Sequence, residues 1–156
     1  ELSMEEGGKF IEAYFGQYPG IRRYLTETTE KARTLGYVET ILGRKRRMPE
    51  MYAPNFQVRQ AAERIAVNMP VQGTAADIVK VVMVQMDEQL NHRKLRTRML
   101  MQVHDELIFE VPQEEMQITK DLVADIMSNA LERKGIYFSV PLRVDIKVGY
   151  TWDDME

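Results

Sequence analysis

Two runs of alternating apolar and polar positions lie on either side of one polar triplet in the second half of the chain. The runs are Met99–Val103 and Leu107–Val111, and the triplet between them is His104-Asp105-Glu106. Alternation with a period of two is typical of half-buried strands. Because only Asp105 and Glu106 remain to reverse the chain, we predict an antiparallel hairpin with these two acids in its turn.

The turn residues of this predicted hairpin are unfavourable for a tight turn. Two-residue hairpin turns usually contain Asn-Gly or another glycine pair, because the backbone there needs positive φ. Asp-Glu meets that need poorly, and a pair of carboxylates at a rigid tip can hold a cation. A solvated acidic surface turn is an equally good interpretation of the spacing alone.

Apolar residues recur at three- and four-residue intervals in the first part of the chain. They predict two helices between Glu5 and Gly36, with a break at Pro19-Gly20. Ser3 followed by Glu6 fits a capping box, and Gly36 suits the left-handed residue after a helix. We interpret the aromatic residues of this region as core residues: Phe10, Tyr14, Phe15, Tyr18 and Tyr24.

The longest helical pattern runs from Gln57 to Leu90. We predict one helix here, kinked at Pro70, because proline lacks an amide proton and its ring clashes with the preceding turn. A shorter amphipathic helix follows Pro112 and ends near Gly135, and Leu142–Val148 alternates like a third strand. These elements predict an α+β fold, in which a hairpin and a third strand are covered by helices.

The composition is that of one folded domain without thiol chemistry. The 156 residues are 44% hydrophobic and 29% charged, which is enough to bury a core. There is no cysteine and there are two histidines, so a metal ion would be bound mainly by oxygen. No apolar run is long enough to span a membrane, and we expect a cytoplasmic protein. The chain opens on Glu1 rather than methionine, so we expect a piece of a longer protein.

The net charge of −3 conceals an uneven distribution along the chain. Residues 1–40 carry a net charge of −2, residues 41–104 carry +6, and residues 105–156 carry −7. A basic middle beside an acidic end suits a polyanion-binding surface next to a metal site. Uneven solvated charge produces the same pattern more commonly.

Four consecutive cations, Arg44, Lys45, Arg46 and Arg47, follow the turn residue Gly43. Closely spaced cations bind backbone phosphates through counterion release, which favours a phosphate-contacting loop. A surface loop whose cations are only hydrated explains these residues equally well.

On the long predicted helix, Arg64, Asn68 and Gln72 recur every four residues. This spacing places a cation and two amides in one row, where amides can contact base edges or sugars, although such rows are usually solvated. The small side chains of residues 73–76 predict close packing of another element or a ligand.

Four segments of the chain closely resemble the end of the polymerase domain of family A DNA polymerases, the bacterial DNA polymerase I type. They are GYVETILGRKRRMPE (36–50), AAERIAVNMPVQGTAADIVK (61–80), MLMQVHDELIFEVP (99–112) and VPLRVDIKVGYTWDDME (140–156). The resemblance covers essentially the whole chain, and QVHDE between apolar strands is specific by itself.

The resemblance implies roles for the predicted tip. Asp105 resembles the palm aspartate that ligates a catalytic magnesium ion, Glu106 resembles a supporting acid, and His104 resembles the histidine that contacts the primer end. Family A enzymes transfer nucleotides: a primer 3′-hydroxyl attacks the α-phosphate of a dNTP, and two Mg²⁺ ions assist.

The resemblance also implies DNA contacts in the basic middle of the chain. Arg64, Asn68 and Gln72 resemble helix residues that contact the primer-template near the active site, and Arg59 resembles a phosphate contact. It implies a palm fragment at about residues 57–156, with fingers-side helices and the basic hairpin at about residues 1–56.

Two motifs of the family are missing from the sequence. The other metal-binding aspartate and the fingers helix that grips the nucleotide both lie upstream in the family. We therefore expect the chain to be inactive alone, and self-association through exposed palm surface stays open. Two alternatives stay open, a stand-alone DNA-binding module and a metal-dependent nuclease centred on the tip.

Overall fold

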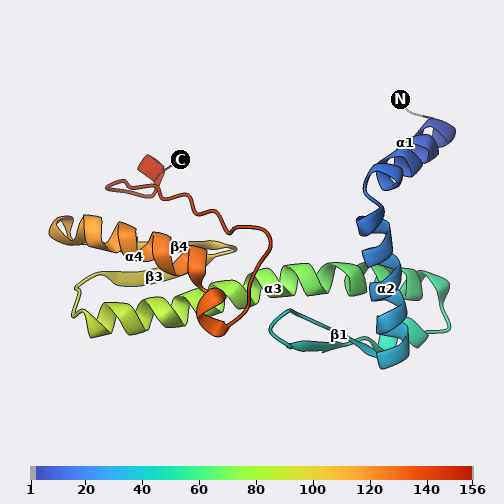
Figure 1. Ribbon diagram of the computed structural model, residues 1–156, viewed down its shortest axis with the longest axis horizontal. Coiled ribbons are helices and arrows are strands. Elements are labelled where there is room, and N and C mark those ends of the chain that lie inside the picture. The colour runs from blue at the N-terminus through green and yellow to red at the C-terminus, as the bar shows by residue number, and fades with distance from the viewer. Residues whose placement is uncertain (1–2, 156) are drawn as a thin grey trace. The chain divides into compact units, whose positions relative to one another are not determined.

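The computed structural model describes residues 3–155 and divides into two compact units, Glu1–Thr74 and Ala75–Glu156. The long helix α3, Phe56–His92, contributes its first half to one unit and its second half to the other (Figure 1). The prediction of one helix over 57–90 is therefore confirmed, with Pro70 inside it. The predicted α+β class is also confirmed.

The first unit begins with two helices, α1 (Met4–Gln17) and α2 (Pro19–Leu35). Ser3 and Glu6 form the predicted capping box, and these bonds from Ser3 lower the pKa of the Glu6 carboxyl. Pro19 begins α2, where its missing amide proton costs no helical bond, and Gly36 ends it at φ 73°. The sequence signals for these helix ends are confirmed.

The aromatic residues of α1 do not form a core. Phe10, Tyr14 and Tyr18 are exposed, and α1 has no buried residue within the part of the chain that the structure describes. The helix is held instead by its cap and by ion pairs, of which Arg22 to Glu12 at 2.8 Å joins α2 to α1. The interpretation of Phe10, Tyr14 and Tyr18 as core residues was wrong, because helical spacing shows a face without showing what covers it. Phe15 and Tyr24 are half-buried.

A small antiparallel hairpin follows α2. Strand β1 (Tyr37–Glu39) pairs with β2 (Lys45–Arg47), and the 3-10 helix η1 (Pro49–Tyr52) leads on to α3. Three of the four consecutive cations thus form a strand. The core of this unit is a cluster of small and methionine side chains: Ala32, Val38, Met48, Met51, Ala62, Ala66 and Met69.

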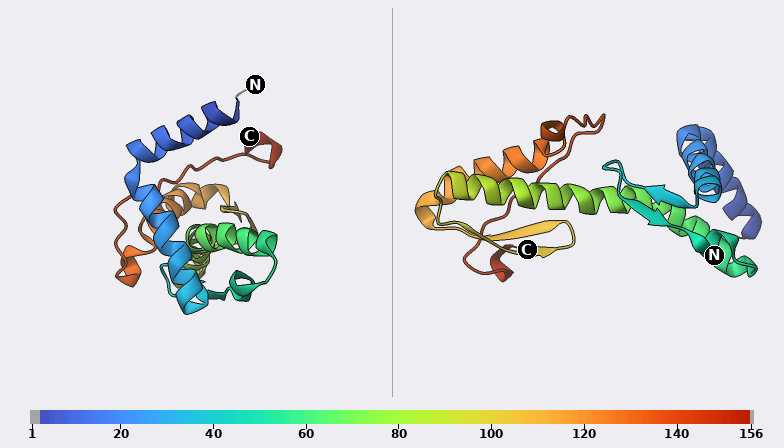
Figure 2. Two further views of the ribbon diagram at one scale, coloured as in Figure 1. Left: turned by 90° about the vertical axis from the view of Figure 1, so that its right-hand side faces the viewer. Right: turned by 90° about the horizontal axis from the view of Figure 1, so that it is seen from below.

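The second unit contains the predicted acidic hairpin. Strand β3 (Arg98–Val103) pairs antiparallel with β4 (Glu106–Glu110), and α4 (Met116–Asn129) packs with the second half of α3 on one side of the hairpin (Figure 2, right). The short 3-10 helices η2 (Gln113–Glu115) and η3 (Glu132–Lys134) flank α4. The shared core consists of Val82, Met86, Leu90, Leu122, Val123, Ile126 and Ala130.

The turn of this hairpin lies one residue earlier than predicted. Val103 pairs with Glu106, so the two turn residues are His104 and Asp105, and Glu106 begins β4. The register also shifts between Met99 and Met101, which leaves Leu100 as a bulge. Because a one-residue shift exchanges the two faces of a strand, the alternation along β3 could not fix which residues face the core.

The predicted third strand over Leu142–Val148 is absent. In this part of the described chain there is no strand, and the segment appears as a plain tube in Figure 2. Residues Val144–Gly149 line a hollow of about 190 Å³ together with β4 and α4. Alternating side chains suit a strand, but a strand also needs a neighbouring strand to which its backbone can hydrogen-bond. Among the described residues, the β3–β4 sheet has no third strand.

None of the helices among residues 3–155 has both the length and the apolar character needed to cross a membrane.

Candidate nucleic-acid interface and metal-binding tip

The β1–β2 hairpin is fastened to α3 by polar contacts. Thr74 accepts a hydrogen bond from the backbone amide of Ile41 at 3.1 Å, and Arg44 Nη2 donates to the carbonyl of Gly73 at 3.1 Å. The turn itself is closed by Thr40, whose hydroxyl accepts from the Arg44 amide at 3.1 Å. The predicted close approach to residues 73–76 is thus made by the basic hairpin.

An open hollow of about 510 Å³ lies between this hairpin and α3. It is lined by hairpin cations and by helix residues that include both predicted amides: Arg44, Lys45, Arg46, Ile65, Asn68, Met69, Gln72 and Gly73. Two features that the sequence separates by more than twenty positions therefore meet at one place. An anion entering the hollow would meet positive charge from one wall and amide groups from the other.

The helix row also contains Arg64, which is exposed one turn before Asn68 but is not among the residues that line the hollow. Asn68 and Gln72 are exposed as well. Arg47 is exposed on β2, opposite Tyr37, and lies outside the hollow. The hollow thus includes only part of the predicted DNA-contacting set.

Arg59 has a local structural role at the start of α3. Its Nη1 donates to the carbonyls of Ala53 at 2.7 Å and Pro54 at 2.8 Å, and its guanidinium lies 5.9 Å from the centre of the Phe56 ring. These contacts hold the segment that precedes α3. A guanidinium has five donors, so donors remain for a phosphate.

The tip of the second hairpin presents three polar side chains to solvent. His104, Asp105 and Glu106 are exposed. His104 has φ 54°, a conformation that L residues rarely adopt, and its carbonyl accepts a bond from Gln102 Nε2 at 2.9 Å. Positive φ at the first turn residue is what a tight hairpin turn requires. The strained residue is thus the histidine, directly before the aspartate.

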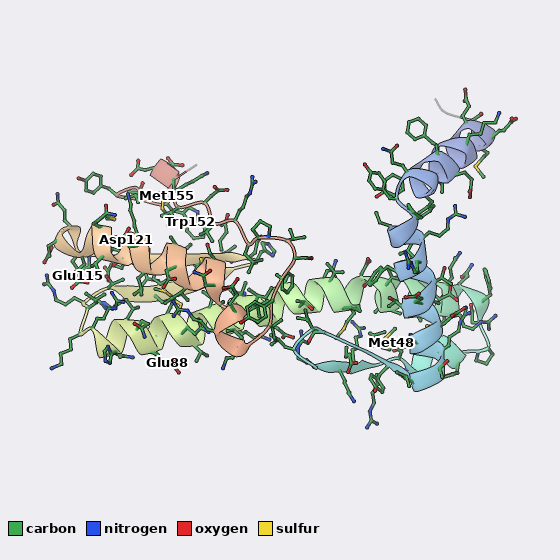
Figure 3. The ribbon with its side chains drawn as sticks, in the orientation of Figure 1. Met48, Glu88, Glu115, Asp121, Trp152 and Met155 are labelled. Carbon is green, nitrogen blue, oxygen red and sulfur yellow. The ribbon has the colours of Figure 1, made fainter. Side chains whose placement is uncertain are left out.

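The strands behind this tip are held from both ends. Leu107 and Phe109 pack against the core of α3 and α4. At the other end of β3, the Glu115 carboxylate accepts from the amides of Arg96 at 2.9 Å and Thr97 at 2.8 Å (Figure 3). The bond from the Arg96 amide is the largest cause of a lowered pKa at Glu115. A tip on strands anchored in this way is a rigid place for a ligand.

Comparison with known proteins places the whole sequence in one family. Residues 1–154 match the family described as DNA polymerase family A. The chain belongs to DNA polymerase family A.

Relatives in this family have similar sequences over nearly the full chain. DNA polymerase I of Mycobacterium bovis is 46% identical over 153 residues, which cover 98% of this chain and 16% of that protein. DNA polymerase I of Bacillus caldotenax is 44% identical, with coverage of 98% and 17%. The chain therefore spans about one sixth of the length of these curated relatives.

A solved structure in the same family has the same fold. It is the POL domain of Pol1 from M. smegmatis in complex with DNA primer-template and dNTP. It is 44% identical to this chain, with a TM-score of 0.92, and the match covers 99% of this chain and 26% of that chain.

Family A polymerases depend on metal ions, and the tip carries two exposed neighbouring carboxylates, Asp105 and Glu106. Among residues 3–155 no group of three or more histidine, aspartate or glutamate side chains is placed to hold a metal ion. A divalent ion needs about six oxygen ligands, and two adjacent ions need several carboxylates to offset their repulsion. The described residues therefore do not fit a complete two-ion site.

The sequence indicated the cations of the basic hairpin and the close approach at Gly73 and Thr74, but it did not indicate Thr40, the hairpin residue that meets them. Thr40 and Thr74 are buried, and Gly73 has no room for a side chain. The glycine inside the long helix was the available signal, because glycine costs helix stability and is favoured there only where another element leaves no room for a side chain.

Proposed function

We propose that this chain is part of a DNA-directed DNA polymerase, an enzyme that adds nucleotides from dNTPs to a primer 3′-hydroxyl and releases pyrophosphate. The observation that carries the proposal is its likeness, at 44% identity over 99% of the chain, to a polymerase domain in complex with primer-template and dNTP. We call the longer protein, of which this chain would be a part, the parent enzyme. It would act in the cytoplasm.

In this proposal the first unit binds the DNA backbone. Lys45 and Arg46 line the hollow beside Asn68 and Gln72, which suits a sugar-phosphate strand. Arg44, Arg47, Arg59 and Arg64 add positive charge around this surface. Arg64, Asn68 and Gln72 are exposed on α3, and this exposure, in addition to their four-residue spacing, supports a role in DNA contact.

The tip of the second hairpin contributes to the catalytic centre. We assign Asp105 as a ligand of Mg²⁺, Glu106 as a supporting acid and His104 as a contact to the primer end. The remaining ligands of two Mg²⁺ ions would come from the rest of the parent enzyme and from the dNTP. Residues 1–156 alone are expected to incorporate no nucleotide.

Primer extension by the parent enzyme tests the assignment. Asp105→Ala should lower incorporation by on the order of a thousandfold, because metal ions supply several kcal/mol of charge stabilisation in the transition state. Asp121→Ala is the matched control, since Asp121 is an exposed aspartate of α4 that bonds Gln117 (Figure 3). Full activity of Asp105→Ala would overturn the assignment.

The basic hollow also favours a second function, DNA binding by the chain itself. This function predicts that the 156 residues bind primer-template with an affinity that falls steeply with salt, without synthesis. Salt-independent or undetectable binding would exclude it.

A further inference from the structure

Gly73 lies on α3 where no larger side chain fits. A Cβ built on Gly73 would meet Thr40 Cγ2 at 2.7 Å and Arg44 Nη2 at 3.2 Å. The first distance is shorter than carbon atoms tolerate, so one partner would have to move. The Arg44 side chain is long and can adjust, whereas Thr40 is buried and stiff at χ1.

Thr40 cannot rotate away without losing a bond. Its hydroxyl accepts from the Arg44 amide at 3.1 Å, while its own amide donates to the Arg44 carbonyl at 3.0 Å. Gly43, at φ 80°, donates to the Thr40 carbonyl at 2.9 Å. The turn that carries the cations is thus built on Thr40, which touches the helix at Gly73.

The hydroxyl of Thr74 makes the second connection. It donates to the carbonyl of Pro70 at 2.5 Å and accepts from the Ile41 amide at 3.1 Å. Because the hydroxyl donates its single proton to the helix carbonyl, its oxygen lone pairs can accept the bond from the hairpin amide. A valine of the same shape could make neither bond, and a serine could make both.

We infer that Thr40, Gly73 and Thr74 form a latch that positions the basic hairpin for DNA, an inference that rests on the proposed function. The latch fixes the hairpin backbone on α3 and so keeps Lys45 and Arg46 in the wall of the hollow. These three are positioning residues, because they act on DNA through the cations.

The test uses variants of the parent enzyme that change the latch without changing charge. Gly73→Ala adds the colliding Cβ, and adding Thr40→Ser removes the methyl group that it meets while keeping the hydroxyl. Thr74→Val removes the hydroxyl, and Thr74→Ser restores it. Thr26→Val is the matched control, because the Thr26 hydroxyl donates to the Arg22 carbonyl within α2 in the same way, at 3.1 Å.

Three readouts are taken with a primer-template duplex as the probe. Gly73→Ala and Thr74→Val should raise its Kd about tenfold and reduce the salt slope by about one to two, because two phosphate-contacting cations lose their position. Amide exchange in residues 37–47 should become faster. The Gly73→Ala, Thr40→Ser double variant and Thr74→Ser should return all values to within about twofold of the native ones.

A charge-reversed reference, Lys45→Glu with Arg46→Glu, separates failure of the latch from failure of the proposed function. If this reference weakens DNA binding but Gly73→Ala and Thr74→Val leave Kd and salt slope unchanged, the latch is refuted and the DNA-binding role stands. If the reference itself binds DNA normally, the role of the basic hairpin is wrong and the latch inference falls with it. Should Gly73→Ala fail to fold, the Thr74→Val and Thr74→Ser pair decides.

Discussion

Residues 3–155 form two antiparallel hairpins that are held in different ways. The β1–β2 hairpin exposes its cations and is fastened to α3 through Thr40, Gly73 and Thr74. The β3–β4 hairpin rests its Leu107 and Phe109 side chains on an apolar core and exposes its acidic tip. Val38 of β1 is buried in the core of its unit, but β2, which carries three of the cations, has no buried residue, so polar contacts hold this part of the hairpin on α3. The longer strands use their apolar face, which leaves the tip free for chemistry.

The largest effect on stability is expected when the apolar core beneath the second hairpin is disrupted. Ile126 is fully buried in the core that Leu107 and Phe109 cover. Ile126→Ala should lower the free energy of unfolding of this unit by about 3 kcal/mol, since it removes buried methylenes and leaves a cavity. Chemical denaturation measures the loss. Ile118→Ala, on the more exposed side of α4, should cost less than half as much, and equal losses would argue against this core.

A smaller effect is expected at the amide wall of the hollow. Gln72→Ala should weaken primer-template binding about fivefold, the worth of about one hydrogen bond of 1 kcal/mol. The salt slope should stay as in the native protein, because no cation is lost. Titrations at several salt concentrations check both values. A reduced slope would show that Gln72 acts through the neighbouring cations.

Relief of strain at the acidic tip should slightly stabilise the protein and impair catalysis. His104 and Lys94 both have φ 54°. Replacing either with glycine should raise the free energy of unfolding by about 0.5 kcal/mol, because the left-handed conformation costs L residues more than the entropy that glycine loses. Primer extension by the parent enzyme should fall for His104→Gly and stay unchanged for Lys94→Gly. Equal activities would show that the histidine side chain has no role.

The smallest effect concerns pH and the far end of β3. The pKa of Glu115 is lowered below its ordinary value of 4.5, mainly by the bond from the Arg96 amide. A lowered folded-state pKa stabilises the fold above the ordinary value, and this stabilisation is lost as pH falls through the folded pKa. Thermal unfolding between pH 6 and about pH 3 should therefore show a steeper loss of Tm in the native protein than in Glu115→Gln. Glu132→Gln, an exposed glutamate of η3, is the control for the change of charge.

Much of the helical architecture could be predicted because its signals are local. The Ser3–Glu6 capping box, Pro19 and Gly36 mark helix ends through bonds within a few residues, and all three are confirmed. The regular spacing of apolar residues along α3 likewise predicted one helix, and the helix continues through Pro70. Such features depend on the chain's own neighbours, which a sequence displays directly.

The errors arose where a partner decides the structure. The bulge at Leu100 and the turn at His104-Asp105 are set by pairing between strands, which alternation does not reveal. Residues 142–148 have the pattern of a strand without a hydrogen-bonded neighbour among the described residues. For the candidate site, the sequence indicated the cations and amides, but only the fold brings Lys45 and Arg46 beside Asn68 and Gln72.

The central claim is that the β1–β2 hairpin binds DNA and the β3–β4 tip contributes to catalysis. A titration of primer-template in a primer-extension assay tests this claim most directly. In the parent enzyme, Asp105→Ala should lower kcat on the order of a thousandfold and leave the KM for DNA within about twofold. Lys45→Glu with Arg46→Glu should raise the KM for DNA at least tenfold and leave kcat at saturating DNA near the native value. If both variants change the same constant, or if Asp105→Ala retains native turnover, the two hairpins do not divide binding and catalysis in this way.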